Sequence, residues 1–303
     1  MKLVAKSSKE LKQLNDRKER GFKHIELQLI EDFMNEDINV DEYIKDILSD
    51  DWTIETVHMP LVPDDIEINV EYLTYPKYRK IFSNCCRLSQ KLAEYYNQDI
   101  SIVIHAGISL ELLKRMPILL ESIVEVFNDE ISKNPNITFS IENFLPFCVN
   151  KKGITLTTFC YFENVELAKY LNKVCNKKVF YTTLDICHML STIGTLELFQ
   201  DIKECHKFIV EIEDFFKNNK TVINNIHLNN IRHLGVGKGK HGVSFDSNNV
   251  EDMHLLEYIL DLYNKYEYKC NLVLEVIEDC YDLAILAEDL KHIIEEKKYE
   301  VYG

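Results

Sequence analysis

The chain has 303 residues, of which 46% are hydrophobic and 28% are charged, so it is long enough to bury a large core. Its formal net charge of −15 argues against nucleic acid as a partner, because such affinity usually comes from basic clusters that neutralise phosphates. The first residues contain no sustained apolar run, and we expect neither a signal peptide nor a membrane partner.

The cysteines indicate a reducing compartment. Their number is odd and none forms a Cys-x-x-Cys pair, whereas a disulfide framework or a zinc finger would need paired spacing. We therefore expect reduced thiols in a cytoplasmic protein. The nine cysteines are Cys85, Cys86, Cys148, Cys160, Cys175, Cys187, Cys205, Cys270 and Cys280.

Apolar runs rich in β-forming residues alternate with longer helical patterns along the whole chain. The predicted strands, in chain order, are Lys2–Ala5, His24–Leu29, Thr53–His58, Ser101–His105, Ile137–Glu142, Val179–Asp185, Val222–Leu228 and Leu272–Val276. The helical patterns lie at residues 8–20, 40–49, 77–97, 109–127, 164–175, 195–217, 251–265 and 279–296.

This alternation favours parallel strands joined by right-handed crossovers. Eight such units close a barrel, and no G-x-G-x-x-G motif of an open nucleotide-binding sheet follows any strand. With six prolines and nine glycines, the chain also lacks a linker rich in these residues. We therefore predict an α/β fold, a single (β/α)₈ TIM barrel, as one metal-binding domain over residues 1–303.

Histidines and acids stand where the apolar runs of the predicted strands stop. They are His58, His105, Glu142, Asp185, His227 and Glu275. The carboxyl ends of barrel strands meet in one ring, so these side chains are expected to converge. A charged group in such a place is costly to desolvate unless it is paired or bound to a metal.

Imidazole and carboxylate together suit zinc, manganese, iron or cobalt, so we predict a site for a divalent metal ion. One ion needs only about four protein ligands, which Glu142, Asp185, His227 and Glu275 supply. His58 and His105 are then surplus and suggest a second ion, giving one or two per chain.

Other ionisable residues have less certain roles. Glu26 lies in an apolar strand. We favour a buried ion pair for it over a role as a base that supports the metal ligands from behind. His188 follows Asp185 by three residues and is either a ligand or a substrate contact. The glycine-rich basic segment Arg232–Phe245 is either a mobile loop or a lid in which Lys238 or Lys240 meets an anionic substrate group.

The strings VHMP, VIHAG, SIENF, LDICH, NIHLNN, RHLGVGKG and LVLEV occur in this order and, as a set, resemble the xylose isomerase-like TIM barrels. That superfamily contains sugar isomerases and epimerases, including sugar phosphate isomerases/epimerases, and apurinic endonuclease family 2. The resemblance runs from His58 to Glu275. It implies a shared metal quartet, to which the endonucleases add two further ligands, matched here by His58 and His105.

The resemblance also matches His188 and His233 with residues that hold a third metal in the endonucleases. That third site uses an aspartate two residues before the second histidine. Here this position is Ile231, which cannot bind a metal, so abasic-site cleavage is in doubt.

Three functions remain open at this point. In the first, a metal-dependent isomerase or epimerase acts on a small sugar or sugar phosphate, with Glu142 and Glu275 removing and returning a proton. His188, His233, Lys238 and Lys240 are then the substrate-binding residues. In the second, a dinuclear centre hydrolyses a phosphodiester as in the apurinic endonucleases. The third is an inert barrel that only binds a ligand.

Overall fold

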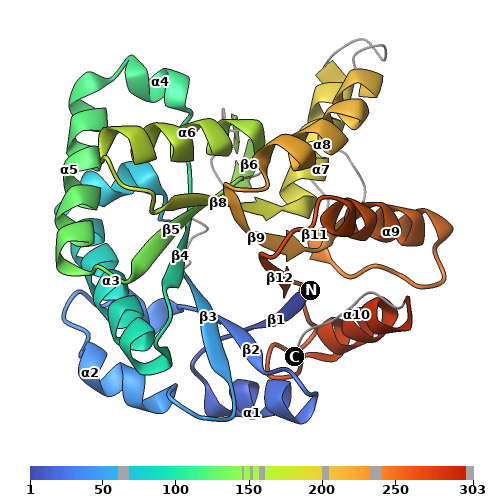
Figure 1. Ribbon diagram of the computed structural model, residues 1–303, viewed down its shortest axis with the longest axis horizontal. Coiled ribbons are helices and arrows are strands. Elements are labelled where there is room, and N and C mark those ends of the chain that lie inside the picture. Colours follow the sequence, from blue (N-terminus) through green and yellow to red (C-terminus); the bar gives the residue numbers. More distant parts are fainter. Residues whose placement is uncertain are drawn as a thin grey trace.

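The computed structural model describes residues 1–60, 68–144, 147–150, 153–156, 161–199, 205–232 and 240–297. Its central feature is a closed barrel of parallel strands in the order β1-β12-β9-β8-β5-β4-β3-β2 (Figure 1). The barrel strands are β1 (Lys2–Ser7), β2 (His24–Gln28), β3 (Thr53–His58), β4 (Ile100–His105), β5 (Ile137–Glu142), β8 (Phe180–Asp185), β9 (Ile223–Leu228) and β12 (Asn271–Leu274). All eight predicted strands are confirmed.

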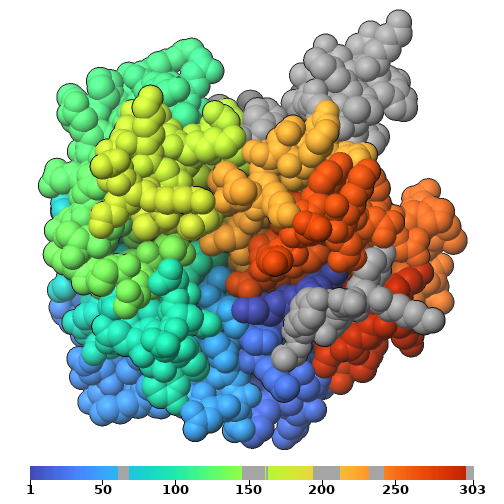
Figure 2. All heavy atoms as spheres, viewed as in Figure 1, coloured from blue at the N-terminus to red at the C-terminus, as the bar shows by residue number. Residues whose placement is uncertain are grey.

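Strand β1 closes the barrel because it pairs in parallel with both β2 and β12. The first and last barrel strands therefore lie side by side, and Figure 2 shows the blue N-terminal residues against orange segments from later in the chain. Outside the barrel, two short hairpins follow β5 and β9. They are β6 (Phe147–Asn150) with β7 (Gly153–Leu156), and β10 (Asn230–Arg232) with β11 (Lys240–Val243).

Helices surround the barrel (Figure 1). They are α1 (Leu11–Glu19), α2 (Val40–Tyr43), α3 (Pro76–Tyr96), α4 (Leu110–Lys114), α5 (Pro117–Lys133), α6 (Tyr161–Val174), α7 (Ile186–Phe199), α8 (Cys205–Asn219), α9 (Val250–Lys265) and α10 (Ile285–Glu296). Short 3₁₀ turns lie at Glu31–Met34, Ile44–Asp46 and Val70–Thr74. Within the described residues, no helix combines the length and the apolar character needed to cross a membrane.

Four helix predictions differ from the structure. The pattern at residues 40–49 is the short helix α2 followed by the 3₁₀ turn Ile44–Asp46, and the pattern at residues 195–217 spans the end of α7 and most of α8. The pattern at residues 109–127 is two helices, because Pro117 lacks the N–H that would continue α4 and instead starts α5. Helix α7 starts directly after Asp185, well before residue 195, because the Asp185 carboxylate accepts a hydrogen bond from the His188 N–H at 2.7 Å and caps the helix. Helix α10 starts at Ile285 and not at residue 279.

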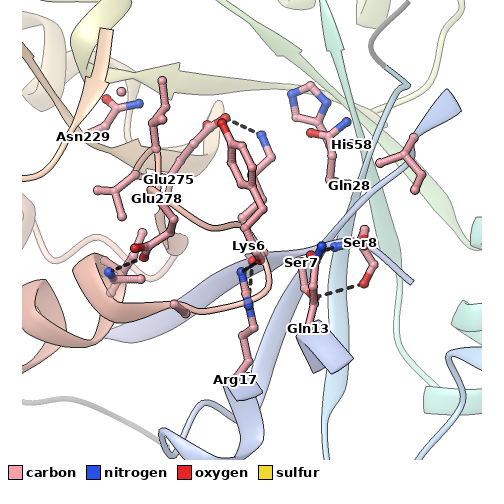
Figure 3. Close-up of a pocket in the computed structure, with 18 of the residues that line it drawn as sticks. Lys6, Ser7, Ser8, Gln13, Arg17, Gln28, His58, Asn229, Glu275 and Glu278 are labelled. Carbon is pink, nitrogen blue, oxygen red and sulfur yellow. Dashed lines mark hydrogen bonds and ion pairs between the residues drawn. The ribbon is translucent and has the colours of Figure 1, made fainter. Parts of the chain in front are cut away.

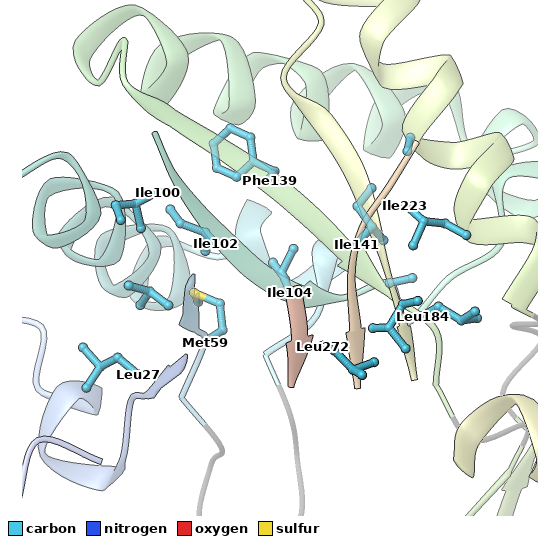
Figure 4. Packing of buried hydrophobic residues seen from close by; sticks show 14 of the residues in the cluster. Leu27, Met59, Ile100, Ile102, Ile104, Phe139, Ile141, Leu184, Ile223 and Leu272 are labelled. Atoms are coloured by element: carbon cyan, nitrogen blue, oxygen red, sulfur yellow. The ribbon is translucent and has the colours of Figure 1, made fainter. Parts of the chain in front are cut away.

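The main core lies between the barrel and the helices (Figure 4). Alternate residues of β4, such as Ile102 and Ile104, are buried in this layer, as the two-residue period of a strand requires. Phe139 of β5 packs there against Phe127 of α5, with 5.0 Å between the ring centroids. Because one face of each strand faces this layer, the other face points into the barrel.

Candidate metal centre

The six side chains predicted to bind a metal lie together at the carboxyl ends of the strands, and Glu142 joins them. Its Oε2 lies 3.1 Å from His58 Nε2 and 3.5 Å from His105 Nε2. Its Oε1 lies 3.3 Å from His227 Nδ1. Glu142 is 1% exposed, so these contacts form away from bulk water.

Four of the six form one compact group. The ligand atoms of Glu142, Asp185, His227 and Glu275 all lie within 4.8 Å of one another. His227 Nδ1 is 3.9 Å from Asp185 Oδ2 and also faces Glu275 Oε2. His58, His105 and Glu142 form a second group of the same kind, so Glu142 belongs to both.

This group passes a test for a bound cation. His227 Nδ1 is buried among oxygens of Glu142, Asp185 and Glu275, yet neither it nor the Glu275 Oε2 that it faces makes a hydrogen bond of ordinary geometry. Such atoms are rare in folded proteins unless a ligand or an ion satisfies them. Imidazole nitrogen and carboxylate oxygen are also the ligands that zinc, manganese, iron and cobalt accept. The donor set therefore fits a divalent metal ion.

Glu26 of β2 supports the other side of the His227 ring. His227 Nε2 lies 3.2 Å from Glu26 Oε2, an oxygen that also accepts hydrogen bonds from Thr56 at 2.7 Å and Asn225 at 3.1 Å. Burial opposes ionisation of Glu26, but His227 and Lys6 outweigh it and lower its pKa to about 2. A carboxylate behind a histidine ring fixes the tautomer and orients the free nitrogen toward a metal.

Two β-bulges place this support. The pairing of β2 with β3 shifts between Ile25 and Glu26, and that of β8 with β9 shifts between Thr182 and Thr183. A bulge adds one residue to one strand and re-aims the side chains that follow. Thr56 and Asn225 follow these bulges and both turn toward Glu26.

Lys6 is a residue of the site that sequence reasoning missed. Its Nζ pairs with Glu275 Oε1 and lies 3.6 Å from Glu26 Oε1 (Figure 3). Burial alone would lower the pKa of Lys6, but Glu275 and Glu26 hold it above its ordinary value. The ion pair expected for Glu26 is thus confirmed with Lys6. The signal was a charged residue directly after the apolar run Leu3–Ala5.

Several carboxylates surround the imidazole ring of His227, and the charges of these groups shift one another's pKa values. The pKa of Glu142 is held well below its ordinary value because His227 and His105 outweigh the effect of burial. The pKa of His227 is held well above its ordinary value because Glu26, Glu275 and Glu142 outweigh burial. The carboxylates therefore remain ionised and attract positive charge to this point.

Asn143 and Asn229 hold Asp185 in place and were also missed. Asn143 accepts from the Asp185 N–H at 2.7 Å and donates to its carbonyl oxygen at 2.9 Å. Asn229 donates to Asp185 Oδ2 at 2.8 Å. Both asparagines belong to the strings SIENF and NIHLNN, which also contain predicted metal ligands. Their position beside these ligands was the feature of the sequence that could have identified them.

The four predicted substrate contacts have different outcomes. His188 lines the cavity beside the cluster, and its Nδ1 lies 2.8 Å from the carbonyl oxygen of Asn143. Because a carbonyl oxygen accepts, this bond makes Nδ1 the donor. His233 and Lys238 lie outside the described residues, and so does the side chain of Lys240, which begins β11. The prediction of a lid falls on the same segment.

A cavity of about 530 Å³ opens beside the cluster, and Gln28 lines it next to His58 (Figure 3). Gln28 Nε2 donates to the carbonyl oxygens of Leu29 at 2.9 Å and Met59 at 3.0 Å. Because two carbonyls require the NH₂ group, the amide orientation is fixed. Gln28 Oε1 is buried without a hydrogen-bond partner, so it is an acceptor available to a ligand.

No protein-family model matches the sequence, and no curated protein matches it. Solved structures do match over nearly the whole chain. A xylose isomerase domain protein from Planctomyces limnophilus is 11% identical with a TM-score of 0.61, and the match covers 97% of this chain and 96% of that one. An L-ribulose 3-epimerase is 11% identical with a TM-score of 0.58, covering 98% and 94%.

An AP endonuclease, family 2, from Brucella melitensis is 14% identical with a TM-score of 0.55, and the match covers 97% of this chain and 98% of that one. At such identities the likeness concerns the fold. The chain has the xylose isomerase-like TIM barrel fold, as its ordered strand-end motifs predicted.

Proposed function

We propose that the chain is a divalent-metal-dependent isomerase or epimerase that acts on a small sugar or sugar phosphate. The observation that carries the proposal is the convergence of His227 Nδ1 with the carboxylates of Glu142, Asp185 and Glu275 around one point. The fold supports it, since a D-tagatose 3-epimerase-like protein and an L-ribulose 3-epimerase share this barrel.

Glu142, Asp185, His227 and Glu275 would hold the ion. When bound, a divalent ion polarises a substrate carbonyl and so acidifies the carbon-bound hydrogen next to it. Asn143 and Asn229 fix Asp185, and Glu26 fixes the His227 ring. The residues around the ligands thus hold the donor atoms in one arrangement before a substrate binds.

Glu142 and Glu275 are the proposed proton carriers. The pKa of Glu275 is held below its ordinary value because His227 and Lys6 outweigh burial, so it is ionised and able to accept a proton. One carboxylate removes the proton from the substrate carbon, and the other returns a proton to the opposite face. His188 and Gln28, which both line the cavity, orient substrate hydroxyl groups.

The test is exchange of carbon-bound hydrogen. The purified, metal-replete protein is incubated in D₂O with a panel of ketoses and ketose phosphates, and deuterium incorporation beside the carbonyl is followed by NMR. The proposal expects exchange that stops when a chelator removes the metal and returns when the metal is restored. Absence of exchange for the whole panel would contradict it.

A second candidate is a dinuclear phosphodiesterase. The observation in its favour is the group of His58, His105 and Glu142, in which Glu142 faces this pair through Oε2 and the quartet through Oε1. A shared carboxylate of this kind suits two neighbouring ions. Elemental analysis separates the two functions: about one metal per chain favours the isomerase, whereas two metals with hydrolysis of bis(p-nitrophenyl) phosphate favour the hydrolase.

A further inference from the structure

The cavity beside the metal centre extends well beyond the residues of the cluster. From the charged cluster it extends past the end of β1 to the space between α1 and α10. We call this extension the lateral arm. It is lined mainly by apolar side chains, namely Ile30, Val276, Ile277, Tyr281, Ala284 and Ala287. At about 530 Å³, the whole cavity falls within the roughly 300–1,000 Å³ range of pockets that enclose drug-sized ligands, which exceed a simple monosaccharide.

The apolar surface of the arm is accessible to a ligand. Tyr281 is 59% exposed and Ile277 is 45% exposed, although both line the cavity. Large apolar side chains left open beside a polar centre are typical of a surface that binds an apolar group.

The cations that line the described part of the cavity are already engaged. Lys6 is paired with Glu275 and Glu26. Arg17 donates through Nε and both Nη atoms to backbone carbonyl oxygens, those of Lys6 at 3.2 Å, Asp282 at 3.0 Å and Tyr281 at 2.9 Å. A phosphate in the arm would have to break these contacts to gain a partner.

The start of α10 is closed to a phosphate as well. Glu278 lines the cavity and accepts hydrogen bonds from the backbone N–H groups of Leu286 at 2.9 Å and Ala287 at 3.0 Å. Those N–H groups are the ones that would otherwise bind an anion. Glu10 adds another acid to the lining. In this part of the lining, Glu10 and Glu278 outnumber the one cation, Arg17, so the arm disfavours an anionic group.

At the other end of the cavity, the polar surface fits hydroxyl groups. Gln28 Oε1 is a buried acceptor without a partner, and a substrate hydroxyl would satisfy it. We infer that the substrate is an uncharged, unphosphorylated sugar that carries an apolar substituent, with its hydroxyls at the metal centre and Gln28 and its substituent in the lateral arm. This inference rests on the proposed function, whose substrate class it narrows.

The test compares binding within matched sets of ligands. For each of several ketohexoses, the free sugar, its 6-phosphate, its 6-O-methyl ether and its 6-O-phenyl ether are titrated into the metal-replete protein by calorimetry. We expect the phenyl ether of the preferred ketohexose to bind about tenfold more tightly than the methyl ether. We expect the 6-phosphate to bind no more tightly than the free sugar.

A variant pair locates the effect. Tyr281→Ser removes the ring from the arm and should abolish most of the preference for phenyl over methyl, while the free sugar binds as before. Tyr75→Ser is the matched control, because Tyr75 is 56% exposed and does not line this cavity. Both residues are exposed, so both variants are expected to fold, which circular dichroism checks.

Tighter binding of the 6-phosphate, equal binding of the phenyl and methyl ethers, or no binding by the whole panel would overturn the inference. Failure of the proposed function looks different. It appears as absence of deuterium exchange, while the phenyl preference and its loss in Tyr281→Ser remain measurable.

Discussion

Four neighbouring barrel strands, β4, β5, β8 and β9, each carry two kinds of polar side chain inside the barrel. Toward the carboxyl ends lies a charged layer, formed by His105, Glu142, Asp185 and His227. Earlier in the same strands lies a neutral layer, formed by Ser101, Ser140, Thr183 and Asn224. Because the two layers lie on the same strands, the main difference between them is the charge of their side chains.

The neutral layer satisfies itself. Ser140 Oγ lies 2.6 Å from Thr183 Oγ1 and donates to Asn224 Oδ1 at 2.6 Å. Asn224 Nδ2 in turn donates to Ser101 Oγ at 3.1 Å. A buried polar network whose members are paired contributes to a unique core and needs no ligand.

The charged layer, which Glu275 joins from the end of β12, is not satisfied in this way, because His227 Nδ1 lies among the carboxylates of Glu142, Asp185 and Glu275 without a hydrogen bond of ordinary geometry. Burying ionised groups in this way costs several kcal/mol per ion unless a counter-charge is present. The comparison teaches that polarity inside a barrel does not mark a site. Unsatisfied donors and acceptors aimed at a common point do.

The largest expected effect is a loss of turnover, and it compares one residue from each layer on the same strand, β5. Glu142→Gln removes the carboxylate shared by both metal-binding groups, and we expect turnover to fall by about 10³-fold or more, since loss of an acid–base group alone costs about 10²–10⁴-fold. The measurement is the rate of deuterium exchange, together with metal content and a circular dichroism spectrum.

Ser140→Ala, two residues earlier on β5, is the control for Glu142→Gln. It leaves Asn224 and Thr183 short of a partner and should cost about 1–3 kcal/mol of unfolding free energy. Its turnover should stay within about tenfold of the natural protein, since it lies away from the proposed proton carriers. Equal losses of turnover in the two variants would mean that the layers do not differ in function.

Lys6 offers a test of the charge balance in the site. Lys6→Met removes the cation shared by Glu275 and Glu26, and breaking a buried pair costs about 3–5 kcal/mol. We expect a loss of about 3 kcal/mol in the metal-free protein and a clearly smaller loss in the metal-loaded one, because the ion supplies positive charge. Denaturant unfolding with and without chelator measures both. Equal losses would make Lys6 a purely structural residue.

The sequence allowed the fold and the ligand cluster to be predicted, because both depend on repeated local patterns. Each barrel strand is a short apolar run, and each ends at the predicted residue or within two of it. For β12, the last strand, Glu275 lies one residue past the strand end. The closed barrel then brings these ends together without any knowledge of side-chain contacts.

The supporting residues could not be predicted in the same way. Asn143 and Asn229 look like ordinary loop asparagines in the sequence, since their partners are atoms of Asp185 on another strand. Lys6 lies beyond the predicted end of the first strand at Ala5, whereas the strand continues to Ser7. The start of α7 depends on the Asp185 side chain acting as a cap, which the helical period alone does not reveal.

Asn229 tests whether such support matters for metal binding. Asn229→Ala removes the donor to Asp185 Oδ2, and loss of a residue that orients a ligand typically costs about 10- to 100-fold in metal affinity. Asn224→Ala in the neutral layer is the matched control, because it removes an asparagine amide from the same region of the chain without contact to a ligand. Competition titration with a metal-sensitive dye measures both. A similar loss of affinity in the control would show that Asn229 acts only through stability.

The smallest expected effect concerns Glu55, a carboxylate whose partners lie within the protein. It tests whether such a carboxylate responds to metal as the charged layer is expected to. Glu55 of β3 accepts from Lys2 at 2.9 Å and lies 2.7 Å from His24 Nδ1; burial raises its pKa, but these two partners outweigh burial and lower it below 4.5. Ionised Glu55 therefore stabilises the folded protein above that pH, and the contribution disappears as the pH falls through the lower folded-state pKa. We expect Glu55→Gln to cost about 1 kcal/mol of unfolding free energy at pH 7 and progressively less toward pH 3. Thermal and denaturant unfolding across this range measure it.

Because Glu55 has its partners within the protein, the cost in unfolding free energy should be the same with and without metal, in contrast to Lys6→Met. A metal-dependent cost would mean that the charged layer extends further down β3 than the hydrogen bonds indicate.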